Sequence, residues 1–119
     1  MTEEKNDTLI FACNGVAPVG QMTNHVAFEL EERGAGKVSC LSGIAAGIAA
    51  KKAIAKDAKR RIALDGCNLK CVQKILENAG FSDYLGVVLL DAGMKVSARK
   101  PSKDEIKKFS DYVLGKIKD

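Results

Sequence analysis

The 119-residue sequence contains no tryptophan, one histidine and two prolines, and aromatic residues make up only 5% of it. Proteins that bind single-stranded nucleic acids stack bases on aromatic rings, so this scarcity argues against such a function. The net charge is only +4 and the lysines are scattered, whereas nucleic-acid-binding domains concentrate basic residues on one face. We therefore expect no nucleic-acid partner.

Long apolar runs are also missing. No stretch approaches the roughly 20 apolar residues that a membrane-spanning helix needs, and the polar start Met1–Asp7 is unlike a secretory signal. We therefore expect no membrane association and a cytoplasmic location, where thiols stay reduced. Four cysteines in such a protein point first to metal ligands or redox groups and last to disulfides. The sequence makes no prediction about a protein partner or a homo-oligomer.

Short apolar segments alternate with segments of helical periodicity, and no linker separates them. The expected strands are residues 8–13, 37–41, 60–65 and 84–90. The expected helices begin at Pro18, near residue 44 (running to 58), at Cys67 and at Ser102, where Glu105 completes a capping box. This order indicates a mostly parallel four-stranded sheet covered by helices. We expect a small Rossmann-like or flavodoxin-like three-layer α/β fold with strand order 2-1-3-4. Residues 1–7 are expected to form a flexible tail, and residues 8–119 a single zinc-binding domain.

Three of the cysteines recur at the same phase of three successive strand–helix units. Cys13 ends the first strand, Cys40 lies near the end of the second, and Cys67 follows the third, at equal intervals of 27 positions. Because the carboxyl ends of parallel strands meet at one edge, these thiols are expected there together. That edge is where open α/β sheets bind their ligands.

Cys71 supplies a fourth thiol at the same place. Positions i and i+4 face one side of a helix, and a helix is expected to begin at Cys67. Four thiolates in a tetrahedron form a zinc site. Gly15 and Gly66 permit tight turns whose N–H groups could donate to sulfur. Asp65 is expected either beside the metal ligands or as a cap of the following helix.

Other uses of the same cysteines stay open. A redox or sulfur-transfer protein would use Cys67 as a nucleophile activated by the helix N-terminus, with another cysteine resolving the intermediate. An iron–sulfur cluster on the four thiolates is a third possibility, and simple burial at strand ends is a fourth. The residues alone predict no substrate and no reaction.

The motif Asp65-Gly66-Cys67, followed by Cys71, resembles the centre of the DGC-domain family, whose members are described as zinc-binding proteins. Cys13-Asn14-Gly15 and Cys40-Leu41 fall where that family has its first two cysteines, although Asn14 replaces a serine of the family pattern. The resemblance covers roughly residues 8–115. It implies that the four cysteines chelate one zinc ion, and it implies no known reaction.

Overall fold

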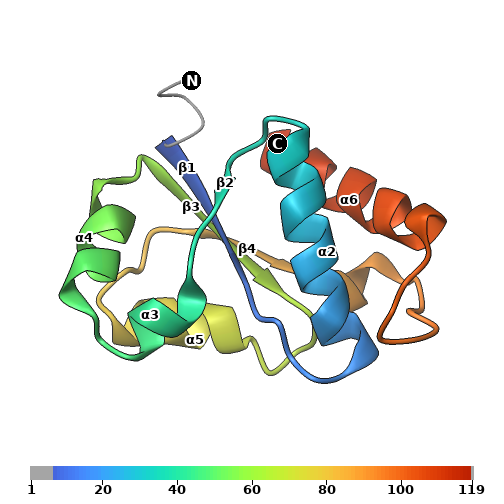
Figure 1. Cartoon of the computed structure of the whole chain (residues 1–119), viewed down its shortest axis with the longest axis horizontal. Helices are drawn as coiled ribbons and strands as arrows, with labels where there is room; N and C mark the ends of the chain where they lie inside the picture. The colour runs from blue at the N-terminus through green and yellow to red at the C-terminus, as the bar shows by residue number, and fades with distance from the viewer. Residues whose placement is uncertain (1–6, 119) are drawn as a thin grey trace.

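The computed structural model describes residues 7–118 and contains one four-stranded sheet (Figure 1). Every strand pair is parallel, and the order is β2-β1-β3-β4, which confirms the predicted topology. The strands are β1 (Thr8–Ala12), β2 (Lys37–Val38), β3 (Arg60–Asp65) and β4 (Leu85–Val88). The predicted tail lies outside the described residues except for Asp7.

Helices cover both faces of the sheet, so the predicted three-layer α/β architecture is confirmed (Figure 1). One face carries α2 (Pro18–Glu32) and α6 (Lys103–Lys118), which pack against each other. The other carries α3 (Leu41–Ala45), α4 (Ala49–Asp57) and α5 (Cys71–Asn78), and a short 3-10 helix, η1 (Leu89–Ala92), follows β4. No helix within residues 7–118 has both the length and the apolar character to cross a membrane.

The central strand β1 explains the two-sided core. Its successive side chains point to opposite faces. Ile10 and Ala12 pack in the core under α2 and α6, whereas Leu9 and Phe11 pack in the core under α3, α4 and α5. Both faces of β1 are therefore buried, as the continuous apolar run of this strand predicts.

Several predicted element boundaries differ in the structure. The helix expected over 44–58 is divided into α3 and α4, because Gly47 adopts a left-handed conformation with φ of 74°. The second strand ends at Val38 instead of 41, since α3 begins at Leu41. The fourth strand ends at Val88 instead of 90, because the chain turns into η1. The two strand changes lie at the carboxyl edge of the sheet.

The capping box at the start of α6 is confirmed. The Glu105 N–H donates to Ser102 Oγ at 3.1 Å, and the Ser102 N–H donates to Glu105 Oε1 at 2.9 Å. The backbone N–H of Ser97 also donates to the Glu105 carboxylate at 3.2 Å. These backbone hydrogen bonds, led by the one from Ser102, lower the pKa of Glu105.

Candidate functional site

The four cysteines lie at the carboxyl edge of the sheet, where the sequence predicts them. Cys13 directly follows β1, Cys40 directly precedes α3, Cys67 follows β3 by two residues, and Cys71 is the first residue of α5. All four thiols are free. Within residues 7–118, however, no three Cys, His, Asp or Glu side chains are placed so that they could hold a metal ion together. The sheet topology therefore places the four cysteines at one edge, but it does not group their sulfurs, and the four-cysteine ligand set stays a prediction.

Cys13 is half-buried in a tightly connected loop between β1 and α2. The Gly15 N–H donates to its sulfur at 3.4 Å, which is the contact expected of a glycine beside a thiol. Thr23 Oγ1 lies 3.7 Å from the same sulfur and accepts from the Asn14 N–H at 3.0 Å. Since the Thr23 hydroxyl has one proton and lies 2.7 Å from the carbonyl of Gly20, that carbonyl is its stronger acceptor. The loop thus holds Cys13 in place through backbone groups.

Two glycines let two loops approach the start of α2 closely. A Cβ on Gly20 would lie 2.7 Å from the carbonyl oxygen of Gly15, and a Cβ on Gly66 would lie 2.9 Å from the carbonyl oxygen of Val19. Side chains at Gly20 or Gly66 would therefore push these backbones apart. Gly66, which the sequence singles out, thus brings the β3–α5 loop against the start of α2, whereas the close approach of the β1–α2 loop depends on Gly20, because a Cβ on Gly15 would make only ordinary contacts.

Cys40 is exposed and lies beside Ser42, with 3.2 Å between Cys40 Sγ and Ser42 Oγ. This side-chain hydrogen bond is the largest cause of a lowered pKa for the Cys40 thiol, and the backbone of Gly43 and the charge of Lys51 add to it. All three contacts favour the thiolate, the form that attacks electrophiles and binds metals.

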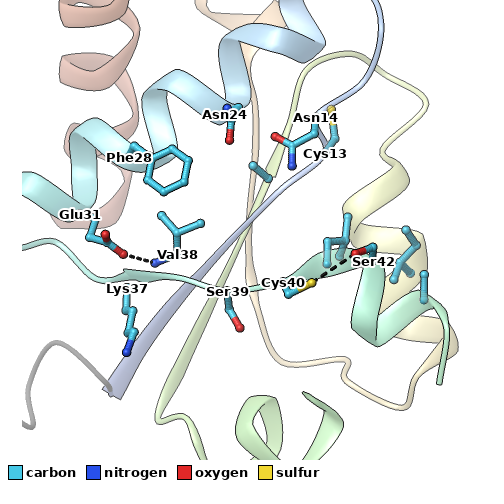
Figure 2. A pocket seen from close by; sticks show the side chains of 14 residues that line it. Cys13, Asn14, Asn24, Phe28, Glu31, Lys37, Val38, Ser39, Cys40 and Ser42 are labelled. Carbon is cyan, nitrogen blue, oxygen red and sulfur yellow. Dashed lines mark hydrogen bonds between the residues drawn. The ribbon is translucent and has the colours of Figure 1, made fainter. Parts of the chain in front are cut away.

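Cys13 and Cys40 both line an open cavity of about 740 Å³ beside the outermost strand, β2. Figure 2 shows the two side chains at different parts of this cavity, with Asn24, Phe28 and Glu31 of α2 along another side. The Glu31 carboxylate accepts from the Val38 N–H at 2.7 Å and so covers an outward-facing backbone group of the edge strand. Sequence reasoning missed the three α2 residues, because no motif marks them.

Cys67 and Cys71 do not share a helix face, and this prediction is wrong. The helix α5 begins at Cys71, and its N-cap is Lys70 in a left-handed conformation with φ of 55°. Cys67 lies in the preceding turn, where its carbonyl accepts from the Lys70 N–H at 3.2 Å. The helix that was expected to activate Cys67 therefore starts four residues later than predicted.

Asp65 is buried at the end of β3 and caps α5 across the intervening loop. Its carboxylate accepts from the Val72 N–H at 2.7 Å and from the Gln73 N–H at 3.4 Å. Lys70 at the N-cap position makes no such bond with its side chain. Burial raises the pKa of Asp65, and the two backbone hydrogen bonds partly offset that rise. Of its two expected roles, capping is the one for which the structure gives contacts.

Comparison with known proteins gives the chain a family. The model of the DGC domain matches residues 9–113. A curated relative, the anaerobic and virulence modulator AnvM of Pseudomonas aeruginosa, is 30% identical over 87 residues, or 73% of this chain and 66% of AnvM. The matched part is slightly less than two thirds of that relative, and no solved structure matches the chain. Since the family model spans nearly all the described residues, the chain belongs to the DGC family.

Proposed function

We propose that this protein binds one zinc ion through Cys13, Cys40, Cys67 and Cys71. The observation that carries the proposal is their common position at the carboxyl ends of β1, β2 and β3 and at the start of α5. Thiolates are preferred zinc ligands, and four of them satisfy its tetrahedral coordination. The DGC family membership supports the same class of function, a metal-binding one.

The four thiols are suitable zinc ligands, but their positions do not form a ready-made zinc site. No three of the described Cys, His, Asp and Glu side chains are grouped as metal ligands. Binding one ion therefore requires the β2–α3 junction and the β3–α5 loop to approach Cys13, which its own loop holds through Gly15 and Thr23. Neither moving segment belongs to the sheet, so such an approach leaves the strands in place.

A zinc ion with four thiolate ligands has no open position for water, so the proposed site is structural or regulatory. The relative AnvM is named as a modulator. A regulatory role in the cytoplasm, where the cysteines stay reduced, agrees with that name.

Metal analysis of the purified protein and of four single Cys→Ser variants tests the proposal. We expect one zinc per wild-type chain and at least tenfold weaker binding in each variant, since each loses one ligand. Ser39→Ala is the matched control, because Ser39 lines the same cavity as Cys13 and Cys40 but offers no thiol. Wild-type affinity in the Cys67→Ser and Cys71→Ser variants would contradict the four-ligand site, and a purified protein with iron and sulfide would favour the iron–sulfur alternative.

A thiol-exchange or sulfur-transfer function is the second candidate, and one observation favours it. Cys40 is exposed at the large cavity, whereas Cys67, the nucleophile predicted from sequence, lies outside the helix expected to activate it. Alkylation of metal-free protein with iodoacetamide, followed by peptide mass mapping, compares the four thiols directly. Preferential alkylation of Cys40 would support this function with Cys40 as nucleophile. Equal, slow modification of all four would contradict it.

A further inference from the structure

A second cavity, which no cysteine lines, lies between α4 and the end of α5. This α4–α5 groove has a volume of about 550 Å³ and is lined by Lys52 and Lys56 of α4, Arg61 of β3 and Phe81 after α5, with small residues between them. Arg61 is the second residue of β3, whereas Asp65 is its last residue and Cys67 follows the strand by two residues. The groove therefore lies toward the opposite end of the strand from the thiols.

All charged side chains that line this groove are cationic. Lys52 and Lys56 form no ion pair within residues 7–118, and no carboxylate lines the cavity. Arg61 is held rigidly, since its Nη1 donates to the carbonyls of Ala55 and Ala58 at 2.9 and 3.1 Å. Its Nε donates to the Asp83 carbonyl at 3.1 Å. These acceptors are neutral carbonyls, so the three cationic side chains line the groove without a carboxylate partner.

The rest of the groove is apolar. The Arg61 guanidinium lies over the Phe81 ring, 5.4 Å from its centroid, and Ala49, Ala53 and Ala79 complete the surface. Three carbonyls in the last turn of α5, those of Ile75, Leu76 and Glu77, accept backbone hydrogen bonds, including one from the Phe81 N–H to the Leu76 oxygen at 2.9 Å. The volume is within the range of small-molecule sites, which combine an apolar lining with a few polar anchors.

We propose that the α4–α5 groove binds a small organic anion with a flat apolar body, of the class of aromatic carboxylates. The carboxylate meets Lys52 and Lys56, and the apolar body lies against the alanines and Phe81. A bare inorganic anion would leave the apolar lining wet, and an uncharged ring would leave the lysines without a partner. This site is independent of the proposed zinc site.

Titration of the ¹⁵N-labelled protein, followed by amide chemical shifts, tests the proposal with 2-naphthoate, its uncharged analogue 2-naphthamide, and acetate. We expect saturable shifts for 2-naphthoate at Gly47, Lys52, Ala53 and Phe81, and much weaker binding of the other two compounds. Equal affinity for 2-naphthoate and 2-naphthamide would overturn the proposal. So would shifts scattered over the surface or shifts centred on the cysteines.

The Lys52→Gln/Lys56→Gln double variant tests the anchors. Both side chains are accessible at the groove, so the variant should fold, and its amide spectrum verifies this. We expect at least tenfold weaker 2-naphthoate binding, because the variant removes both charge-assisted contacts to the carboxylate. Lys51→Gln is the matched control, since Lys51 lies on the same helix but does not line the groove, and it should bind like the wild type. Unchanged affinity in the double variant would overturn the assignment.

Discussion

Asp65 is a buried carboxylate whose two hydrogen bonds hold the start of α5 to the end of β3. We predict that Asp65→Ala lowers the free energy of unfolding by about 1–3 kcal/mol, because the buried Val72 N–H loses its acceptor. Asp65→Asn keeps an acceptor oxygen and should lose less. Urea unfolding followed by circular dichroism measures both variants.

Asp104→Ala is the control for this prediction. Its carboxylate lies 3.1 Å from Lys108 Nζ on the surface of α6, where an ion pair contributes little. Losses of equal size at Asp104 and Asp65 would contradict the capping role of Asp65. Sequence reasoning placed Asp65 correctly at the strand end, but it could not choose between its two roles. The acceptor and the Val72 N–H are seven residues apart, so their contact depends on the path of the loop between them.

Ionisation of Tyr84 should lower the stability of the protein at alkaline pH. Its hydroxyl donates to the Glu77 carboxylate, and this hydrogen bond is the main cause that raises the pKa of Tyr84 to about 12. Because the folded pKa exceeds the unfolded value of about 10, the neutral form adds stability below pH 10. That contribution disappears as the pH rises from about 10 to 12.

Absorbance of tyrosinate in a Tyr112→Phe background, which leaves Tyr84 as the single tyrosine, follows this titration. We predict that Glu77→Gln shifts the Tyr84 pKa downward, since the hydrogen bond to a charged carboxylate is replaced by a weaker one to a neutral amide and the carboxylate charge no longer opposes ionisation. Lys74→Gln on the same helix is a suitable control that leaves the Glu77 contact intact. An unchanged titration curve in Glu77→Gln would show that the hydrogen bond does not govern Tyr84.

At the scale of elements, replacement by alanine should have opposite effects on stability at two helical glycines. A Cβ at Gly20 of α2 would meet the backbone of Gly15 at 2.7 Å, whereas nothing lies within 4 Å of a Cβ at Gly115 of α6. We predict that Gly20→Ala costs about 1–3 kcal/mol because a backbone must shift. Gly115→Ala should stabilise the protein by about 0.5–1 kcal/mol through helix propensity. Thermal unfolding of both variants measures the contrast, and destabilisation by both would contradict it.

The predicted elements fail where local pattern and tertiary position disagree. Residues 44–58 are rich in Ala, Ile and Lys, and Gly47 is expected only to weaken the start of one helix, yet Gly47 adopts a left-handed conformation and the chain forms two helices. The four-residue separation of Cys67 and Cys71 predicts a helix that begins at Cys67. In the structure the Asp65 carboxylate accepts from the backbone N–H groups of Val72 and Gln73, and the helix begins at Cys71. In both cases the periodicity identifies the helix, whereas a distant contact or a backbone turn sets its first residue.

At the scale of the whole molecule, the sheet order could be predicted because parallel strands, short connections and right-handed crossovers leave few topologies. The same reasoning places the cysteines at one edge. It cannot bring sulfurs within bonding distance, because Cys40, Cys67 and Cys71 lie in the junctions whose boundaries were predicted least well. The candidate site is thus predictable to the level of a sheet edge, and the grouping of its ligands depends on loop positions.

Hydrogen exchange should separate the rigid sheet from that edge. Ile10 and Ala63 are buried in the paired central strands β1 and β3, so their amides should exchange only on global unfolding. The amides of residues 66–71 should exchange faster, through local opening of the β3–α5 loop. Zinc bound by all four cysteines should slow exchange in both places, since each opening then releases the ion. Zinc held by Cys13 and Cys40 alone would slow Ile10 and Ala63 but leave local opening at 66–71 unchanged. Unchanged local opening at residues 66–71 would contradict a site that includes the β3–α5 loop. The same effect of zinc on exchange in the wild type and in Cys71→Ser would contradict it as well.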